Sequence, residues 1–278
     1  MKAAETAPFA PAARVASRFV EARRTATALP DYPGPVPGDL EHAYAIQESA
    51  IGLWPDTIVG WKVGRILPPY EERFHEVRLL GPVFARAILR PASPDARVDF
   101  PVFVGGFAAV EAEYVFEIGS DAPARQTIWT LEEAAALAGK LHIGVETAGS
   151  PLATINALGP TAVISDFGNN AGLILGAEIA GWRGRELNTL SCETFVDDVS
   201  VGRGGAAALP GGPVEALRFT AELCARRDRP LKAGMFVSTG AATGIHELKV
   251  GDTARVEFAG IGAIRCRAVP FDASHAAS

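Results

Sequence analysis

The sequence predicts an α+β fold that is rich in β-sheet and has a helical N-terminal region. Apolar residues recur at helical spacing in the first fifty residues, whereas short apolar runs separated by Gly and Pro begin near residue 58. Beyond residue 107 only two helical segments interrupt the predicted strands. Grouped strands with few intervening helices favour this architecture over a doubly wound parallel sheet.

Two amphipathic helices are predicted near the N-terminus. From Pro11 onward the apolar side chains are spaced as on one face of a helix, and this pattern stops at a Pro-rich connector over residues 29–37. A second helix begins after Asp39, because a carboxylate at this position can accept from the free backbone N–H groups of the first turn. This helix fades near Gly52.

The rest of the chain consists mainly of predicted strands and turns. One further helix opens with a capping box formed by Thr130 and Glu133 and runs to Lys140, and another covers residues 212–227 with a proline in its first turn. Strands beyond residue 107 are predicted over residues 110–118, 142–146, 162–165, 172–175, 193–201, 235–239, 254–258 and 263–268.

This pattern divides the chain into three predicted segments. We expect a helical and loop-rich N-terminal region over residues 1–90 and a β-rich catalytic domain over residues 91–272. A frayed tail is expected over residues 273–278, because its residues are small and polar.

Composition excludes several classes of protein. No apolar stretch approaches the roughly 18 residues of a membrane-spanning helix, and the N-terminus lacks the apolar region of a secretory signal. We therefore expect a soluble, cytoplasmic protein with no membrane partner. A net charge of −6 without basic patches argues against a nucleic-acid partner. Cys192, Cys224 and Cys266 are far apart in the sequence, so we expect them to be reduced and packed.

The predicted strand over residues 110–118 carries two acids at strand spacing. Glu111 and Glu113 point to the same face, with their carboxylates about 7 Å apart along the strand, while the even-numbered residues face the core. Two acids on one face are a metal-ligand geometry. The alternative is a solvated outer face, which Glu117 on the same side favours.

Two more acids are candidates for the same site. Glu146 closes a predicted strand, and Asp166 occupies a comparable strand end. Such positions often carry functional groups on a rigid scaffold. Three carboxylates without a neighbouring Cys or His suit a hard, oxygen-loving cation, Mg²⁺ or Mn²⁺, better than zinc.

Other residues could supply acid–base or anion-binding groups. Lys62 lies between bulky apolar neighbours on a short predicted strand, where it could be desolvated and act as an acid or base, or could extend into solvent. Thr239 and Gly240 end a strand and could hold an anion or form a plain turn. His75 and Glu76 could form an acid–base dyad on a mobile lid or belong to a solvated helix fragment.

Taken together, several segments resemble one family of enzymes. They have the same order and approximate spacing as the corresponding motifs of the 2-keto-4-pentenoate hydratase and 4-oxalocrotonate decarboxylase group. That group belongs to the fumarylacetoacetate hydrolase superfamily. The resemblance spans roughly residues 12–270 and depends on the following segments in combination: 43–47, Gly60-Trp-Lys-Val-Gly64, Glu111-Ala-Glu113, Gly144-Val-Glu146, 166–176, 231–234, Ser238-Thr-Gly240 and 251–253.

The resemblance implies a mixed β-roll or sandwich fold, a divalent metal ion and assembly as a homo-oligomer. It implies that Lys62 and Asp166 line the pocket as catalytic residues and that Thr239 and Gly240 contact the substrate. It also implies the carboxylate ligands of the metal ion, which are Glu111, Glu113 and Glu146.

The chain departs from the family pattern at three places. The segment Arg78-Leu-Leu-Gly81 stands where the hydratases usually have a Pro-Asp-aromatic-Gly turn, so Leu79 replaces an acid that some members use. Asp166 is followed by Phe167 where an Asn is typical, and Ala241 occupies the place of a frequent Ser. These departures leave open which reaction and substrate the chain has kept.

The residues support one main hypothesis and two alternatives. The main hypothesis is a metal-dependent hydratase or decarboxylase that acts on a 2-hydroxydienoate or related small 2-oxo acid through a metal-stabilised enolate, with Lys62 moving protons. One alternative is an acylpyruvate hydrolase or oxaloacetate decarboxylase in which His75 and Glu76 activate water. The other is an inactive binding module of the same fold, which the missing acid at Leu79 would permit.

Overall fold

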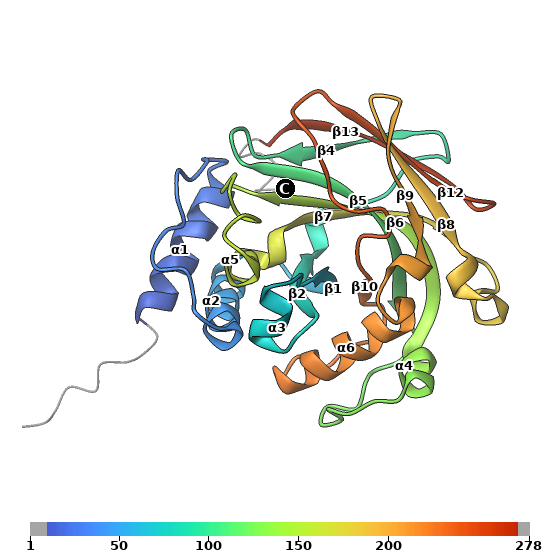
Figure 1. The fold of residues 1–278 in the computed structure, drawn as a ribbon, viewed down its shortest axis with the longest axis horizontal. Coiled ribbons are helices and arrows are strands. Elements are labelled where there is room, and N and C mark those ends of the chain that lie inside the picture. The colour runs from blue at the N-terminus through green and yellow to red at the C-terminus, as the bar shows by residue number, and fades with distance from the viewer. Residues whose placement is uncertain (1–9, 272–278) are drawn as a thin grey trace, which may run out of the picture.

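Two mixed β-sheets form the body of the protein in the computed structural model, which describes residues 10–271. Figure 1 shows the long curved strands of the first sheet crossed by the strands of the second, with helices at the periphery. The α+β prediction is therefore confirmed. The predicted frayed tail lies outside the described residues.

The first sheet has eight strands in the order β2-β1-β10-β5-β6-β7-β3, and β11 also pairs with β5. Its neighbouring strands are antiparallel except for β1 with β10 and β3 with β7. Three of its strands come from the first 90 residues. The bounds are β1 (Ile58–Arg65), β2 (Arg78–Phe84), β3 (Ile88–Leu89), β5 (Phe107–Ile118), β6 (Ala138–Ser150), β7 (Asn170–Glu178), β10 (Phe236–Ser238) and β11 (His246–Glu247).

The second sheet has five strands in the order β4-β13-β12-β8-β9. Its strands are β4 (Arg97–Val102), β8 (Ser191–Val196), β9 (Val199–Gly205), β12 (Thr253–Phe258) and β13 (Gly262–Pro270). The main core lies between the sheets, where the ring of Tyr114 on β5 meets that of Phe258 on β12 with centroids 5.7 Å apart. The even-numbered residues 110–116 are all buried in this core, as their strand alternation predicts.

Six α-helices and five short 3₁₀ turns connect the strands within the described residues. The helices are α1 (Ala10–Arg24), α2 (Leu40–Leu53), α3 (Tyr70–Phe74), α4 (Leu131–Leu137), α5 (Pro160–Ser165) and α6 (Gly212–Arg226). The 3₁₀ turns are η1 (Ala85–Ala87), η2 (Phe167–Asn169), η3 (Trp182–Gly184), η4 (Leu187–Thr189) and η5 (Ala206–Ala208). Among the described helices, none has the length and apolar content that crossing a membrane would require.

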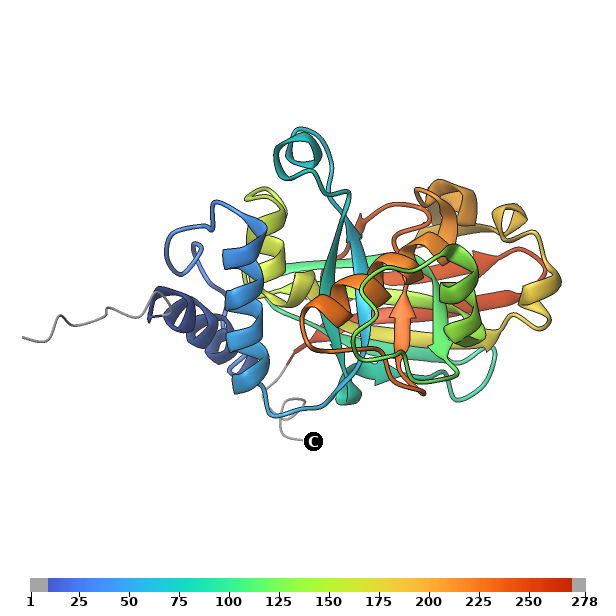
Figure 2. The ribbon, with the colours of Figure 1, turned by 90° about the horizontal axis from the view of Figure 1, so that it is seen from below.

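The helices gather at two places around the sheets. Helix α2 packs against both α1 and α5 at one end of the molecule, and α4 and α6 lie together at another (Figure 1). The short α3 projects from the body beyond the β1–β2 hairpin (Figure 2). The predicted N-cap of α2 is confirmed, because the Asp39 carboxylate accepts from the backbone N–H of His42 at 2.9 Å.

Three predicted elements have different structures. Residues 162–165 are not a strand but part of α5, which begins with a proline at its first position. The strand predicted over residues 193–201 is a β8–β9 hairpin, in which Asp197 and Asp198 take positive φ at the turn. The helix predicted to reach Lys140 ends at Leu137, because β6 pairs with β5 from Ala138 onward.

Candidate metal centre and its pocket

The register between β5 and β6 assembles three carboxylates. Glu111 lies directly opposite Glu146, and Glu113 lies opposite Gly144 on the next pair of the same face. Directly opposed residues in an antiparallel pair are close neighbours, so side chains from the two strands converge. One carboxylate oxygen from each of the three glutamates lies within 4.8 Å of the others.

These glutamates are buried. Glu111 is 4% exposed, and Glu113 and Glu146 are each 0% exposed. The alternative of a solvated strand face is therefore excluded for this part of β5. Glu117, farther along the same face, is half-buried. Its carboxylate lies 3.2 Å from His142 Nε2 and accepts a hydrogen bond from it when that nitrogen carries the proton.

Each of two carboxylates has one oxygen held by a protein donor and one without a partner. The backbone N–H of Gly240 donates to Glu113 Oε2 at 2.6 Å, and Asn170 Nδ2 donates to Glu146 Oε1 at 3.1 Å. The remaining oxygens, Glu113 Oε1 and Glu146 Oε2, are buried without a hydrogen-bond partner. Buried acceptors without a donor are costly, and a cation would satisfy both.

The ammonium group of Lys62 is the positive charge closest to Glu146 in the described structure. Its Nζ lies 3.1 Å from Glu146 Oε1, and both side chains are buried. Burial alone would lower the pKa of Lys62, but the charges of Glu146 and Glu111 outweigh this effect and raise it. When all three carboxylates are ionised, the one ammonium leaves two negative charges uncompensated, which matches the charge of a divalent ion.

Burial also acts on the glutamates. It raises the pKa of Glu111 to about 8, with a further contribution from the charge of Glu146, and it raises the pKa of Glu113 well above the ordinary value for the same two reasons. The three residues can hold a hard cation through oxygen atoms, and within residues 10–271 no nitrogen or sulfur ligand joins the group. The residues present therefore fit the divalent metal ion that the resemblance implies.

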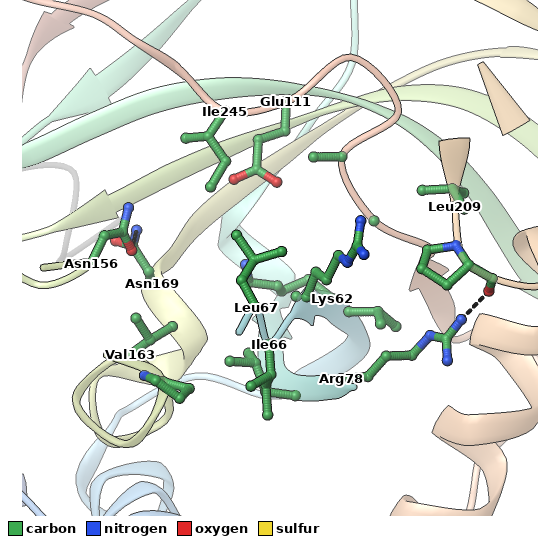
Figure 3. Close-up of a pocket in the computed structure, with 18 of the residues that line it drawn as sticks. Lys62, Ile66, Leu67, Arg78, Glu111, Asn156, Val163, Asn169, Leu209 and Ile245 are labelled. Atoms are coloured by element: carbon green, nitrogen blue, oxygen red, sulfur yellow. Dashed lines mark hydrogen bonds between the residues drawn. The ribbon is translucent and has the colours of Figure 1, made fainter. Parts of the chain in front are cut away.

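A cavity of about 650 Å³ opens beside this group. Figure 3 shows the Glu111 carboxylate pointing into it from β5. Lys62, Glu111, Thr239 and Gly240, all selected from the sequence, line the cavity. The Thr239 hydroxyl donates to the Tyr114 carbonyl at 2.7 Å, which fixes the side chain at the wall.

Asp166 does not line this cavity. Arg23 of α1 binds its carboxylate through two hydrogen bonds, from Nε to Oδ1 at 2.6 Å and from Nη2 to Oδ2 at 3.0 Å. Arg23 Nη1 also donates to the Asn170 carbonyl at 3.0 Å. Asp166 is thus connected to the carboxylate group through Arg23 and Asn170, without reaching the cavity itself.

The residues of the predicted lid dyad lie beside α3. His75 is exposed and follows the helix with a positive φ, while Glu76 accepts from the backbone N–H of Val77 at 2.9 Å. Neither side chain lines the cavity, although Leu67 and Tyr70 of the same excursion do. A catalytic dyad at His75 and Glu76 stays a prediction.

Sequence reasoning missed two functional candidates. Asn170 follows a turn in which Phe167, Gly168 and Asn169 all take positive φ, and strained backbone of this kind gathers at functional sites. The sequence signal that could have indicated Asn170 is the pair Asn169-Asn170 directly before an apolar run. Arg78 is buried on β2 and lines the cavity, and an Arg within an otherwise apolar strand could have indicated it.

The fold and the site together define an α+β protein with a buried three-carboxylate candidate metal centre beside a cavity. The solved structure of 4-oxalocrotonate decarboxylase from Pseudomonas putida G7, complexed with magnesium and adipate, has the same fold with a TM-score of 0.76. It is 19% identical and covers 93% of this chain and 97% of its own. The predicted fold of the fumarylacetoacetate hydrolase type is confirmed by this likeness.

Two characterised relatives carry the resemblance at the level of sequence. A 4-oxalocrotonate decarboxylase from Pseudomonas putida is 29% identical over 108 residues, which are 39% of this chain and 41% of that protein. A 2-keto-4-pentenoate hydratase from Paraburkholderia xenovorans is 27% identical over 156 residues, which are 56% of this chain and 57% of that protein. The chain thus aligns with about half the length of these relatives. No family model matches it. The resemblance to this group of enzymes, predicted from the motifs, is confirmed.

Proposed function

We propose that the protein is a divalent-metal-dependent lyase that hydrates or decarboxylates a small 2-oxo acid. The observation that carries this proposal is the buried group of three glutamates with two unpartnered carboxylate oxygens, whose one nearby cation in the described part of the chain is Lys62. The similarity to decarboxylases and hydratases supports it. The magnesium bound in a structure of the same fold supports Mg²⁺, and the oxygen ligands suit Mn²⁺ equally.

The ligands would be Glu111, Glu113 and Glu146. When bound, the ion would act as a Lewis acid that stabilises negative charge developing on the 2-oxo group. Gly240 and Asn170 hold one oxygen of Glu113 and of Glu146, respectively. Gly240 has a φ of +119°, which a side chain would disfavour, so a glycine here allows its N–H to face Glu113.

Lys62 is the proposed proton carrier. Its Nζ lies within hydrogen-bond distance of Glu146 and at the cavity wall, so it can hold a proton next to a bound substrate. Leu79 lines the cavity near it: a Cβ built on Gly64 would lie 2.8 Å from Leu79 Cδ1 and 3.6 Å from Lys62 Nζ. This apolar side chain leaves Lys62 without a neighbouring acid from β2.

Thr239, Gly240 and Asp166 complete the proposal. Thr239 and Gly240 would contact the substrate from the cavity wall. Asp166 would be a positioning residue, since it acts on the site through Arg23 and the backbone of Asn170. We further propose a cytoplasmic homo-oligomer, on the basis of the resemblance, and light scattering on the purified protein would measure its mass in solution.

The decisive experiment is calorimetric titration of oxalate, a mimic of the enolate of a 2-oxo acid, with Mg²⁺ and again after EDTA. We expect oxalate to bind only when Mg²⁺ is present. Glu113→Gln should abolish this binding, because it removes one of the three carboxylates. The matched control is Glu117→Gln, on the same face of the same strand but outside the group, which should bind normally.

Either of two results would overturn the proposal. Oxalate binding that is unchanged by EDTA would exclude a role for the metal ion in binding. Equal oxalate binding by the two variants would exclude the three glutamates as the metal ligands. With metal-dependent binding established, a screen of 2-oxo acids for hydration and for release of CO₂ would distinguish the two lyase reactions.

A further inference from the structure

A second cavity lies between the two sheets, on the other face of β6 from the three glutamates. Thr147 of β6 and Val269 of β13 line it, and Thr147 directly follows Glu146 on a strand whose successive side chains point to opposite faces. The volume of this cavity is about 460 Å³, within the range of about 300 to 1,000 Å³ that is usual for small-molecule sites. Among the described residues, none lines both cavities.

Five aromatic side chains line the second cavity, in two groups. Trp54, Phe84 and Phe167 contact one another, with ring centroids 5.9, 5.8 and 5.0 Å apart. Phe103 and Phe271 stack with their centroids 5.0 Å apart. Aromatic rings attract a further ring in edge-to-face or offset stacking, beyond the effect of burying apolar area. These walls therefore favour an aromatic ligand over an aliphatic one of the same size.

The buried charge at this cavity is already compensated. Arg23 is the one buried charged residue among the described residues that line it. Its guanidinium lies over the rings of Phe103 and Phe167, 5.5 and 5.1 Å from their centroids, and the Asp166 carboxylate neutralises it through two hydrogen bonds. Moving a charged ligand out of water without an opposite charge is costly, so a neutral ligand is favoured.

The charges at the rim of the second cavity are paired or exposed. Arg267 Nε donates to Asp99 Oδ1 at 3.0 Å. The two oxygens of Asp56 each accept from a backbone N–H group, at 2.7 and 3.0 Å. Arg86 is exposed, so water screens its charge. The rim thus adds little preference for an ion of either sign.

A buried hydroxyl group is available to a ligand. Thr147 is 2% exposed, and its hydroxyl makes no hydrogen bond within residues 10–271. Gly172 lies opposite it on β7 and leaves room for it, because a Cβ built there would lie 2.8 Å from Thr147 Oγ1. Buried polar groups normally have a hydrogen-bond partner. A ligand with one hydroxyl group would provide it.

We propose that the second cavity binds a neutral aromatic molecule that carries a hydroxyl group. The ring lies among the five aromatic side chains, and the hydroxyl shares a hydrogen bond with Thr147 Oγ1. The site is separate from the carboxylate group and needs no metal ion, so this inference goes beyond the proposed lyase activity and does not depend on it.

The first test compares phenol with cyclohexanol, a saturated ring of similar size with the same hydroxyl group. Calorimetric titration of the full chain would measure both affinities. We expect saturable binding of one phenol per chain, about 2- to 10-fold tighter than that of cyclohexanol, as contacts between aromatic rings allow. Equal affinities for the two ligands would contradict the aromatic class.

The second test locates the ligand with two variants of the turn η1. Ala87→Leu fills part of the second cavity and should weaken phenol binding by at least about fivefold, because the added atoms occupy the space of the ring. The matched control is Ala85→Leu, at an exposed residue of the same turn that does not line the cavity, which should bind phenol normally.

A third test addresses the hydrogen bond. Thr147→Val keeps the shape of the side chain and removes its hydroxyl group. The ratio of phenol affinity to toluene affinity should fall about 2- to 10-fold in this variant, because only phenol can use that group. An unchanged ratio would exclude Thr147 as the partner.

Two other results would overturn the second site as a whole. One is the absence of saturable phenol binding to the wild-type chain. The other is equal phenol affinity in Ala87→Leu and Ala85→Leu, which would place phenol elsewhere. Displacement of phenol by oxalate with Mg²⁺ would likewise place it in the first cavity. Since phenol binding is measured without metal, failure of the lyase proposal would leave this test intact.

Discussion

At the scale of single residues, the site depends on a balance of buried charges. Three buried glutamates face one buried lysine, and the groups that donate hydrogen bonds to two of the carboxylate oxygens are the backbone N–H of Gly240 and the side chain of Asn170. Groups in such surroundings interact more strongly than they would at the surface, so single substitutions should have large and distinguishable effects.

Lys62→Met should separate proton transfer from metal binding. We expect turnover to fall by about 10²- to 10⁴-fold, because a positioned acid–base group is lost. Mg²⁺ affinity should be retained or increased, since one positive charge disappears from beside Glu146. Steady-state kinetics and Mg²⁺ titration would measure the two effects. Unchanged turnover would remove Lys62 from the reaction, and Arg65→Met at the exposed rim of the cavity is the control.

Asn170→Ala should weaken metal binding without removing a ligand. The variant loses the hydrogen bond from Nδ2 that orients Glu146, and groups that orient metal ligands typically contribute about 10- to 100-fold in affinity. Mg²⁺ titration would measure the loss. Asn156→Ala, at an exposed residue of the same cavity, should bind Mg²⁺ normally. Equal affinities for both variants would contradict the positioning role of Asn170.

At the scale of secondary structure, the site depends on close contact between β2 and the turn η2. A Cβ built on Gly81 of β2 would lie 2.1 Å from the carbonyl oxygen of Phe167. Because the obstacle is backbone, a side-chain rotation cannot relieve the contact. The glycine therefore allows β2 to support the left-handed turn over residues 167–169, which precedes Asn170.

Gly81→Ala should consequently destabilise the protein. We expect a loss of about 3 kcal/mol, at the upper end for overpacking, together with weaker Mg²⁺ binding because the turn must shift. Chemical denaturation and Mg²⁺ titration would measure these changes. In contrast, Gly52→Ala in α2 meets no atom within 4 Å and should be neutral or stabilising by up to about 1 kcal/mol. Similar stabilities of the two variants would show that the close approach of residue 81 to the Phe167 carbonyl does not restrict which side chain fits there.

At the scale of the whole molecule, the buried carboxylates link stability to pH and to the metal ion. The pKa of Glu111 rises from 4.5 to about 8 on burial, and that of Glu113 also rises. The native state therefore holds protons that the unfolded chain releases. This contribution to stability is fully present below pH 4.5 and is lost as the pH rises through the native pKa.

Thermal unfolding should show this linkage. Without metal, we expect Tm to fall as the pH is raised from about 5 to about 8, through the window set by Glu111. Mg²⁺ should raise Tm, and by more at pH 8 than at pH 5, because it competes with protons for the same oxygens. Glu113→Gln should show little response to Mg²⁺, whereas Glu117→Gln should respond normally. A Mg²⁺ shift that is the same at both pH values would contradict the linkage.

Several features followed from the sequence because they depend on local spacing. The helical periodicity and the Asp39 N-cap predicted α2 nearly to the residue. Strand alternation placed Glu111 and Glu113 on one face and their even-numbered neighbours in the core. The prediction that Cys192, Cys224 and Cys266 are reduced and packed is confirmed, since all three are free and buried.

Local spacing failed where longer-range pairing competes with it. Residues 138–140 extend a helical pattern, yet they join β6 because the ladder with β5 provides backbone hydrogen bonds that the helix end cannot. The segment 162–165 is apolar enough for a strand, but Pro160 starts a helix there that packs against α2. Such outcomes depend on neighbours that are remote in the sequence.

The sequence by itself determined the α+β class, the acidic residues of the candidate metal centre and the strand face that carries two of them, because composition and periodicity are local properties. Only the tertiary structure decided that these carboxylates are buried, that Glu146 lies opposite Glu111, and that Asp166 is held by Arg23 outside the cavity. The physical reason is that burial and charge pairing depend on strand register and on contacts between distant segments, which residue spacing alone does not specify.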